Sequence, residues 1–317
     1  MKQYDVVIIG NGPVGMFTSS MAGYYNLSTL VVENQHEPGG QVSKFYPQKL
    51  VKDIPGFTSI LGKDYINGLK TQQQAYSELV EVLYNIQITS YQQVDGLFYL
   101  FNDSNQCIAI SKYIIFAYGK GSYEPIRFEI NKQIVDFDNI SYHLNPNLDY
   151  NNKHIVILGG GDSALDSAEW IKTNFSSASV SIIVRKSIAG KTLNENDFKR
   201  LNINTYLDQT ILECTNNSLT IEDNTTKHLQ TLSFDRILVQ YGFKFSSEKN
   251  PFSSWNELKF DATNKLVVNE QYETSLANVY AVGDCATQSG NPFYCIVSGQ
   301  AQGFNVINTI KKQLNTK

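Results

Sequence analysis

Two stretches of this 317-residue chain repeat the same order of apolar and polar positions. The first runs from the apolar segment "YDVVIIG" through the helical pattern "PVGMFTSSMAGYY" to a second apolar run, "STLVVE". The other begins with "KHIVIL" near Lys153 and ends with "ASVSIIVRK" near Lys186. Because continuous β-branched runs are typical of strands buried on both faces of a parallel sheet, each stretch predicts a strand–helix–strand unit.

Shorter strand patterns surround these units. "FYLFNDSNQCIAISKYIIFAYGKG" indicates a β-meander that ends at Gly119, "LSFDRILVQYGF" and "NKLVVNEQYETSLANVYAVGDCA" are strand-like, and "SGQAQGFNVINTIKKQL" has helical spacing. We therefore expect an α/β protein with two Rossmann-like, three-layer ββα dinucleotide-binding domains, the second inserted into the first. The predicted first domain is formed by residues 1–119 and 243–317, and the predicted second domain by residues 120–242.

Composition narrows the function. Hydrophobic residues make up 42% of the chain and charged residues 18%, which suits a folded enzyme, and a formal net charge of -4 offers no basic field for nucleic acid. No apolar stretch approaches the roughly 20 residues that span a membrane, and the start of the chain lacks a signal-peptide pattern, so we expect a cytoplasmic protein. The four cysteines show neither C-x-x-C pairing nor metal-ligand spacing, so no metal is expected.

The first glycine turn, "GNGPVG", has the G-x-G-x-x-G spacing between a strand and a helix. The glycines allow a tight turn, close approach of a pyrophosphate and close packing of the helix on the strand. Glu33 ends the next strand, where a carboxylate can hold a ribose. The dinucleotide-binding candidates here are Gly10, Gly12, Pro13, Val14, Gly15 and Glu33; an ordinary strand–helix turn is the alternative.

The second turn, "GGGDSA", has the G-x-G-x-x-A variant, and its next strand ends in cations rather than an acid. A cation there favours the 2′-phosphate of NADP(H) over the free ribose of NAD(H), although a solvated basic pair would look the same. The candidates are Gly159, Gly161, Asp162, Ser163, Ala164, Arg185 and Lys186. Two dinucleotides with different ribose partners suggest a resident flavin, FAD, and a visiting nicotinamide nucleotide.

With these motifs, the chain resembles the two-dinucleotide flavoprotein reductases of the thioredoxin reductase type. "VYAVGDCA" is similar to their second flavin signature, and "GGQVSKFYPQKLVKDIPGF" and "FAYGKGSYEP" resemble segments of one branch, the type 2 ferredoxin–NADP reductases. The resemblance implies further flavin contacts at Gly40, Gln41, Tyr46, Tyr91, Tyr123, Gly283 and Asp284. It also implies electron transfer between NADPH and ferredoxin or flavodoxin, a homodimer, and rotation of the domains during turnover.

The absence of a thiol pair separates this chain from the disulfide reductases. Thioredoxin reductases carry C-x-x-C before the second glycine turn, where this chain has "NISYHLNPNLDY", and a related branch carries a cysteine where this chain has Val14. We interpret Cys285 and Cys295 as buried small side chains rather than a redox pair. No acid–base catalyst is expected, because the cofactors supply the chemistry and the four histidines, His36, His143, His154 and His228, form no cluster in sequence.

Departures from the family pattern leave the acceptor open. Val184 stands where a histidine is common, and the chain ends at "KKQLNTK" without the extension that covers one flavin face in many relatives. A more open flavin face would suit an NAD(P)H-dependent reductase of a disulfide, quinone or other small acceptor. A nucleotide-binding redox sensor without turnover is a further alternative.

Overall fold

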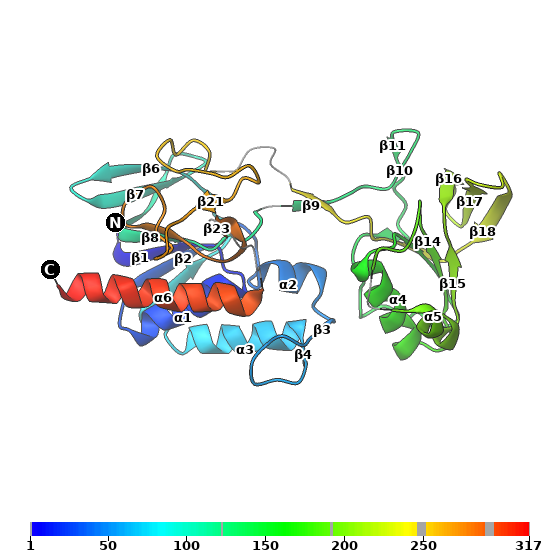
Figure 1. The fold of residues 1–317 in the computed structure, drawn as a ribbon, viewed down its shortest axis with the longest axis horizontal. Coiled ribbons are helices and arrows are strands. Elements are labelled where there is room, and N and C mark those ends of the chain that lie inside the picture. Colours follow the sequence, from blue (N-terminus) through cyan, green and yellow to red (C-terminus); the bar gives the residue numbers. More distant parts are fainter. Residues whose placement is uncertain (1, 122, 191–192, 246–251, 289–294, 317) are drawn as a thin grey trace. The chain divides into compact units, whose positions relative to one another are not determined.

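The structure, a computed structural model, describes residues 2–121, 123–190, 193–245, 252–288 and 295–316. The chain divides into two compact units (Figure 1). Met1–Ser122 and Phe245–Lys317 form the first, and Tyr123–Lys244 forms the second. The boundaries expected from the sequence, near residues 119 and 243, lie a few residues away. The α/β class, with two Rossmann-like units and the second inserted into the first, is confirmed.

The first unit is built on a seven-stranded sheet in the order β5-β2-β1-β8-β7-β6, with β22 also paired to β8. Its strands β1, β2, β5, β8 and β22 pair in parallel. Strands β6 and β7 pair antiparallel with each other, and β7 pairs antiparallel with β8, which forms the meander. The strands are β1 (Gln3–Ile9), β2 (Thr29–Val32), β5 (Val80–Leu83), β6 (Ile88–Val94), β7 (Leu97–Asn102), β8 (Cys107–Phe116) and β22 (Val279–Ala281).

Helices cover one face of this sheet. Val6 and Ile8 of β1 point into a core with Val306 and Ile310 of α6. Val7 and Ile9 point to the opposite face, into a core shared with the meander and the segment that begins at Phe252. Figure 1 shows α6 running alongside α1, although the two lie at opposite ends of the sequence. The helices are α1 (Pro13–Tyr24), α2 (Gly40–Phe45), α3 (Gly62–Gln74) and α6 (Ile296–Asn315). Short elements complete the unit: β3 (Leu50–Val51), β4 (Ile60–Leu61), β21 (Leu266–Val267), η1 (Gly283–Cys285) and β23 (Ala286–Thr287).

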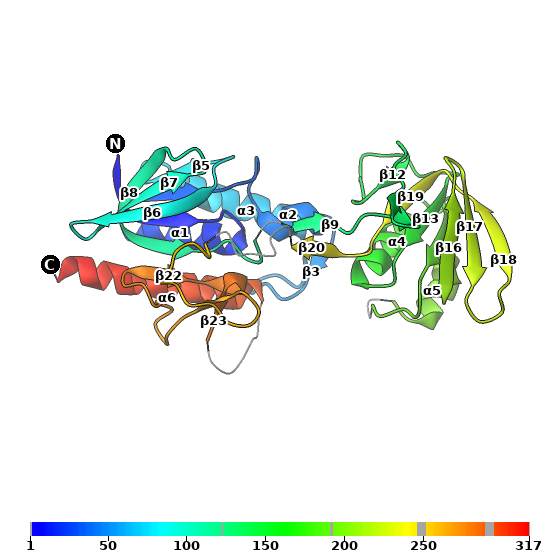
Figure 2. The ribbon, with the colours of Figure 1, turned by 90° about the horizontal axis from the view of Figure 1, so that it is seen from above.

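The second unit has a parallel sheet in the order β12-β19-β13-β14-β15. Helices α4 and α5 pack on one face of it, and the antiparallel layer β16-β17-β18 packs on the other, so the three-layer arrangement is complete (Figure 2). Its sheet strands are β12 (Ile140–Ser141), β13 (His154–Leu158), β14 (Ser179–Ile183), β15 (Ile203–Tyr206) and β19 (Arg236–Val239). The helices are α4 (Asp162–Asn174) and α5 (Glu195–Leu201). The remaining strands are β9 (Tyr123–Pro125), β10 (Glu129–Ile130), β11 (Gln133–Ile134), β16 (Gln209–Cys214), β17 (Ser218–Asp223), β18 (Leu229–Ser233) and β20 (Phe243–Phe245), with β9 paired to β20.

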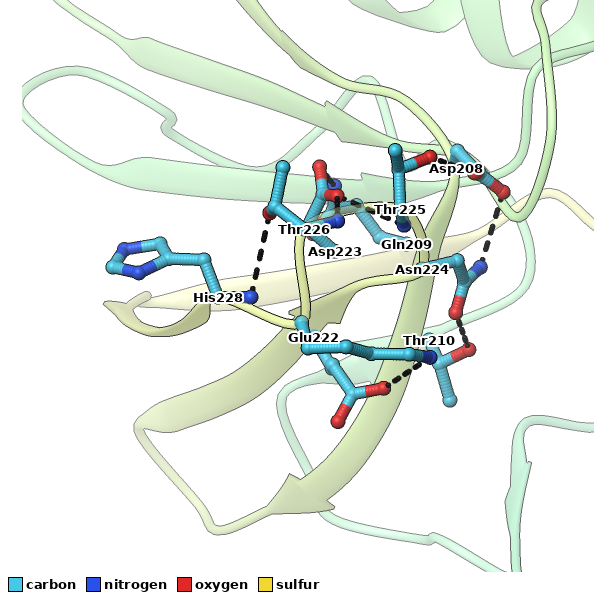
Figure 3. Close-up of polar contacts among 10 residues, drawn as sticks. Asp208, Gln209, Thr210, Glu222, Asp223, Asn224, Thr225, Thr226 and His228 are labelled. Carbon is cyan, nitrogen blue, oxygen red and sulfur yellow. Dashed lines mark hydrogen bonds and ion pairs between the residues drawn. The ribbon is translucent and has the colours of Figure 1, made fainter.

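A group of polar side chains fixes the turn between β17 and β18 (Figure 3). Asp223 Oδ1 accepts hydrogen bonds from the N–H groups of Thr225 and Thr226 at 3.0 and 2.7 Å, and Asp208 accepts one from Asn224 Nδ2 at 3.1 Å. These carboxylates therefore serve the turn. Within the described ranges, no group of three or more His, Cys, Asp or Glu side chains is arranged to hold a metal ion, and none of the helices is apolar over a length that could cross a bilayer.

Candidate cofactor sites

The first glycine turn joins β1 to α1. Gly10 has φ 108°, and a Cβ there would come 2.6 Å from the Ala117 carbonyl oxygen. A Cβ on Gly15 would overlap the Gly10 carbonyl oxygen, so the packing of α1 on β1 requires glycine, whereas a Cβ on Gly12 would have its nearest neighbour 3.9 Å away. No side chain caps α1, which begins at Pro13. Its first N–H groups therefore form an anion site with open space beside Gly12.

Glu33 lies directly after β2, and only 7% of it is exposed. Its Oε2 accepts a hydrogen bond from the Asn11 backbone N–H at 2.7 Å, and its Oε1 accepts one from the Gln35 N–H at 2.9 Å. Each carboxylate oxygen keeps lone-pair capacity for a ribose hydroxyl. Asn11 itself was missing from the predicted site residues; its position inside the glycine motif was the only signal that could have found it.

The short helix α2 begins beside this turn. Gly40 has φ 53°, and a Cβ on it would stand 3.2 Å from the Cα of Gly12. The Gln41 side chain lies beside Gly119, which follows β8: its Nε2 is 3.5 Å from the position that a Cβ on Gly119 would take. Gly40 therefore lies at the first glycine turn and Gln41 lies beside Gly119, while their contacts with a flavin stay a prediction.

The Gly283–Asp284 turn meets α1 and α6. Gly283 has φ 73°, and its N–H donates to Gln302 Oε1 of α6 at 2.7 Å. A Cβ on Gly283 would be 3.3 Å from Val14 Cγ2, and one on Gly299 would be 2.6 Å from that atom. Three segments that are distant in sequence thus converge, and the predicted residues Val14 and Gly283 are neighbours.

Tyr46 and Asp284 act on each other electrostatically. Burial raises the pKa of Tyr46 to about 12, and the negative charges of Asp284 and Asp53 add to that increase. Tyr46 therefore stays protonated at neutral pH and is able to donate a hydrogen bond. Together with the first glycine turn, these residues form a cradle of backbone N–H groups, a tyrosine hydroxyl and carboxylates.

Tyr91 lies away from the first glycine turn, and its role as a flavin contact stays a prediction. It pairs with Leu100, which pairs with Ala109 of β8, so it is level with the amino end of β1, whereas the glycine turn follows the carboxyl end. Its ring packs 4.3 Å from that of Trp255, and its hydroxyl donates to Glu257 at 2.7 Å. Tyr91 therefore supports the meander rather than the cradle. The side chain of Tyr123, also predicted, lies outside the described residues.

The second glycine turn repeats the geometry of the first. Gly159 has φ 134°, and a Cβ there would overlap the Gln240 carbonyl oxygen, whereas a Cβ on Gly161 would meet no atom within 4 Å. Ala164 is fully buried where α4 packs on the sheet. No side chain caps α4, and its first residues, Asp162 and Ser163, are exposed. An anion again fits between the turn and the helix.

Arg185 and Lys186 follow β14 and are both exposed. The Arg185 guanidinium lies 5.1 Å from the centre of the Tyr241 ring. Burial raises the pKa of Tyr241 to about 12 although the Arg185 charge opposes the increase, so the ring remains a neutral surface for the cation. This contact holds the guanidinium at the carboxyl end of the sheet, where the ribose of the second dinucleotide is expected.

The cysteines do not add a redox centre to these sites in the described part of the chain, where all four are free thiols. Cys285 is buried, and burial raises its pKa to about 12, so it carries no appreciable thiolate at neutral pH. Cys295 is the N-cap of α6, where its sulfur accepts from the Ser298 N–H at 3.4 Å. Among the histidines, His154 places its Nε2 2.8 Å from Ser181 Oγ on the neighbouring strand of the second sheet.

Both turns fit a dinucleotide. Each has an uncapped helix N-terminus and a middle glycine beside open space, which is what a pyrophosphate requires. The ribose positions differ in charge, with the buried Glu33 at one and the exposed Arg185 at the other. The first site thus suits a free ribose diol and the second a phosphorylated ribose.

Comparisons with known proteins agree with this geometry. A family model described as "Pyridine nucleotide-disulphide oxidoreductase" matches residues 4–305. A ferredoxin–NADP reductase of Mycoplasmoides gallisepticum is 34% identical over 322 residues, covering 99% of this chain and 96% of that protein, and one of Ligilactobacillus salivarius is 35% identical over 297 residues, covering 90% and 85%. The thioredoxin reductase of T. acidophilum has the same fold, with a TM-score of 0.74 and 20% identity over 99% of this chain and 100% of that one.

Proposed function

Because the chain belongs to the thioredoxin reductase-like ferredoxin–NADP reductases, within the pyridine nucleotide-disulphide oxidoreductases, we propose that it holds FAD and transfers electrons between NADP(H) and ferredoxin or flavodoxin. The observation that carries the proposal is the pair of uncapped glycine turns with opposite charges at their ribose positions. One turn suits a dinucleotide with free ribose hydroxyls, and the other suits NADP(H).

The first unit would hold FAD. Backbone N–H groups at the start of α1 would bind the pyrophosphate, Glu33 would accept the ribose hydroxyls, and Asp284 would accept hydroxyls of the ribityl chain. Gln41 and the protonated Tyr46 would contact the ring system. When bound, FAD accepts a hydride and releases electrons singly, which couples a two-electron donor to a one-electron carrier.

The second unit would hold NADP(H). Helix α4 would bind the pyrophosphate at Gly161, and Arg185 and Lys186 would pair with the 2′-phosphate. The task of the protein is then to position two cofactors and exclude water, which requires no acid–base triad. A flavin-linked disulfide relay is disfavoured by the buried, protonated thiol of Cys285.

An anaerobic titration tests the proposal. The purified, yellow protein is mixed with NADPH without an acceptor, and the flavin absorbance near its visible maximum is followed; then ferredoxin, flavodoxin, a quinone and a disulfide are supplied in turn. We expect rapid bleaching and fastest reoxidation by ferredoxin or flavodoxin. A colourless protein that cannot be reconstituted with FAD, or a flavin that NADPH does not reduce, would overturn the proposal. Fastest reoxidation by the quinone or disulfide would favour the small-acceptor alternative.

The homodimer implied by the resemblance is part of the same proposal. Sedimentation of the full chain at micromolar concentration tests it directly, because a dimer has twice the 35.7 kDa mass of the chain. A single species at the monomer mass would contradict it.

A further inference from the structure

Asn11 joins five parts of the first unit. It is fully buried inside the first glycine turn. Its backbone N–H donates to Glu33, its carbonyl oxygen accepts from the Gly39 N–H at 2.9 Å, and its side chain lies between Gln73 of α3 and Tyr84, which follows β5. Asn11 therefore links Glu33, through its backbone, with Gln73 and Tyr84, through its side chain.

Ser19 sets the direction of the side-chain hydrogen bonds in this network. The single hydroxyl proton of Ser19 is donated to the Met16 carbonyl oxygen at 2.9 Å, so Ser19 Oγ accepts from the buried Gln73 amide, whose Nε2 is 2.7 Å away. The same Gln73 Nε2 donates to Asn11 Oδ1 at 3.0 Å. Since the oxygen of the Asn11 amide faces Gln73, its Nδ2 faces Tyr84.

Tyr84 is consequently an acceptor within the network. Asn11 Nδ2 donates to the Tyr84 hydroxyl oxygen at 3.2 Å, which leaves the hydroxyl proton of Tyr84 to be donated elsewhere. Across the residues that the structure describes, no protein group accepts that proton. Burial raises the pKa of Tyr84, the bond from Asn11 opposes this, and the charge of Glu33 adds to the increase, so the proton is retained at neutral pH.

Tyr84 supplies a hydrogen-bond donor and Glu33 an acceptor on either side of Asn11, and the Glu33 charge acts on the phenol. Both are bonded to Asn11, one to its side chain and one to its backbone N–H. A ribose hydroxyl that donates to Glu33 still needs a donor for its own oxygen, and the phenol of Tyr84 is a donor for which the described residues supply no acceptor. We propose that Tyr84 donates a hydrogen bond to the adenosine ribose of the dinucleotide held at the first glycine turn, with Gln73 and Asn11 as the residues that position it.

This inference rests on the proposed binding of FAD, and ligands that lack one ribose hydroxyl test it. Full-length Tyr84→Phe and the unsubstituted chain are freed of flavin and titrated with FAD and with two analogues, carrying 2′-deoxyadenosine or 3′-deoxyadenosine. We expect Tyr84→Phe to raise the Kd for FAD about three- to tenfold, the range for one neutral hydrogen bond. For the analogue that lacks the contacted hydroxyl, the same substitution should change Kd less than about twofold.

Tyr4→Phe is the matched control. Tyr4 lies at the other end of β1, and its hydroxyl donates to Glu81 at 2.9 Å, so this substitution removes a tyrosine hydroxyl without touching the glycine turn. It should leave the Kd of all three ligands unchanged. An unaltered Kd for FAD in Tyr84→Phe, or an equal loss for FAD and both analogues, would overturn the role of Tyr84. If the unsubstituted chain binds no FAD at all, the proposed function fails with it.

Discussion

Gly303 of α6 packs against Thr18 of α1 so closely that a Cβ on the glycine would overlap the threonine Oγ1. The contact has no room to adjust, because Thr18 is buried and its hydroxyl donates to the Val14 carbonyl oxygen at 2.7 Å. Through it, the last helix of the chain fixes the first, and the Gly283–Asp284 turn is held beside Val14.

Gly303→Ala should therefore destabilise the protein. Overpacking at such a contact costs about 1–3 kcal/mol in the free energy of unfolding, which urea denaturation of the flavin-saturated chain would measure. Gly68→Ala in α3 is the matched control, since a Cβ there meets no atom within 4 Å. That variant should gain about 0.5–1 kcal/mol from helix propensity. Shifts of the same sign in both would contradict the packing argument.

Gly161 and Gly159 should respond differently to alanine. A Cβ on Gly161 meets open space, so Gly161→Ala should fold with an unchanged midpoint of thermal unfolding. The same Cβ would occupy the space expected for a pyrophosphate, so the Kd for NADPH and for NADH should each rise at least about tenfold. Gly159→Ala should lower the midpoint, because its Cβ would overlap the Gln240 carbonyl oxygen. Undiminished nucleotide binding by Gly161→Ala would place the phosphate elsewhere.

Arg185→Ala should reduce the preference of the protein for NADPH over NADH. Loss of a charge-assisted hydrogen bond to the 2′-phosphate should weaken NADPH at least about tenfold and leave NADH within about twofold. Equilibrium titration of the flavoprotein with each nucleotide measures this. Arg200→Ala, which removes an exposed cation paired with Asp197 in the same unit, should affect neither. Equal weakening of NADPH and NADH would discard the 2′-phosphate role.

The thiols should be dispensable for ferredoxin reduction. Because the pKa of Cys285 is raised to about 12, iodoacetamide at pH 7.5 should not modify it in the folded chain, as peptide mass analysis would detect. The double variant Cys285→Ala, Cys295→Ala should keep its rate of ferredoxin reduction by NADPH. Loss of that rate, with the flavin still reduced by NADPH, would instead indicate a thiol relay.

Asp5 should make the stability depend on pH in the acid range. Burial alone would raise the pKa of its carboxyl, but hydrogen bonds from Lys112 and Ser28 lower it below the ordinary 3.8. A carboxyl with a lowered pKa stabilises the fold above its ordinary pKa, and the contribution disappears as pH falls through the lowered value. Asp5→Asn should thus cost about 1 kcal/mol at pH 7, with the difference shrinking below about pH 4.

The control for this measurement is Asp95→Asn, at an exposed turn whose φ of 51° suits asparagine equally. Its free energy of unfolding should match that of the unsubstituted chain at every pH at which Asp5→Asn is measured. A difference between Asp5→Asn and the unsubstituted chain that persists unchanged into acid would refute the assignment.

Local pattern determined the fold class of this protein and the place of its two glycine turns. A strand, a turn and a helix within some 30 residues are fixed by apolar spacing, by glycines at positive φ such as Gly10, and by the residue that ends the next strand. The contrast between Glu33 and Arg185 is equally local, because each simply follows its strand. These features depend on neighbouring residues alone, so they can be predicted without knowing how the helices and sheets pack.

Tertiary structure alone decided which distant residues meet. It separated glycines required by the fold, such as Gly159, from those that leave room for a ligand, such as Gly161, since only a neighbouring backbone makes that difference. It moved Tyr91 to the meander, and it joined Gln73 and Tyr84 through Asn11. The physical reason is that contacts between residues dozens of positions apart depend on how helices cross the sheet, and one sequence pattern is compatible with many such crossings.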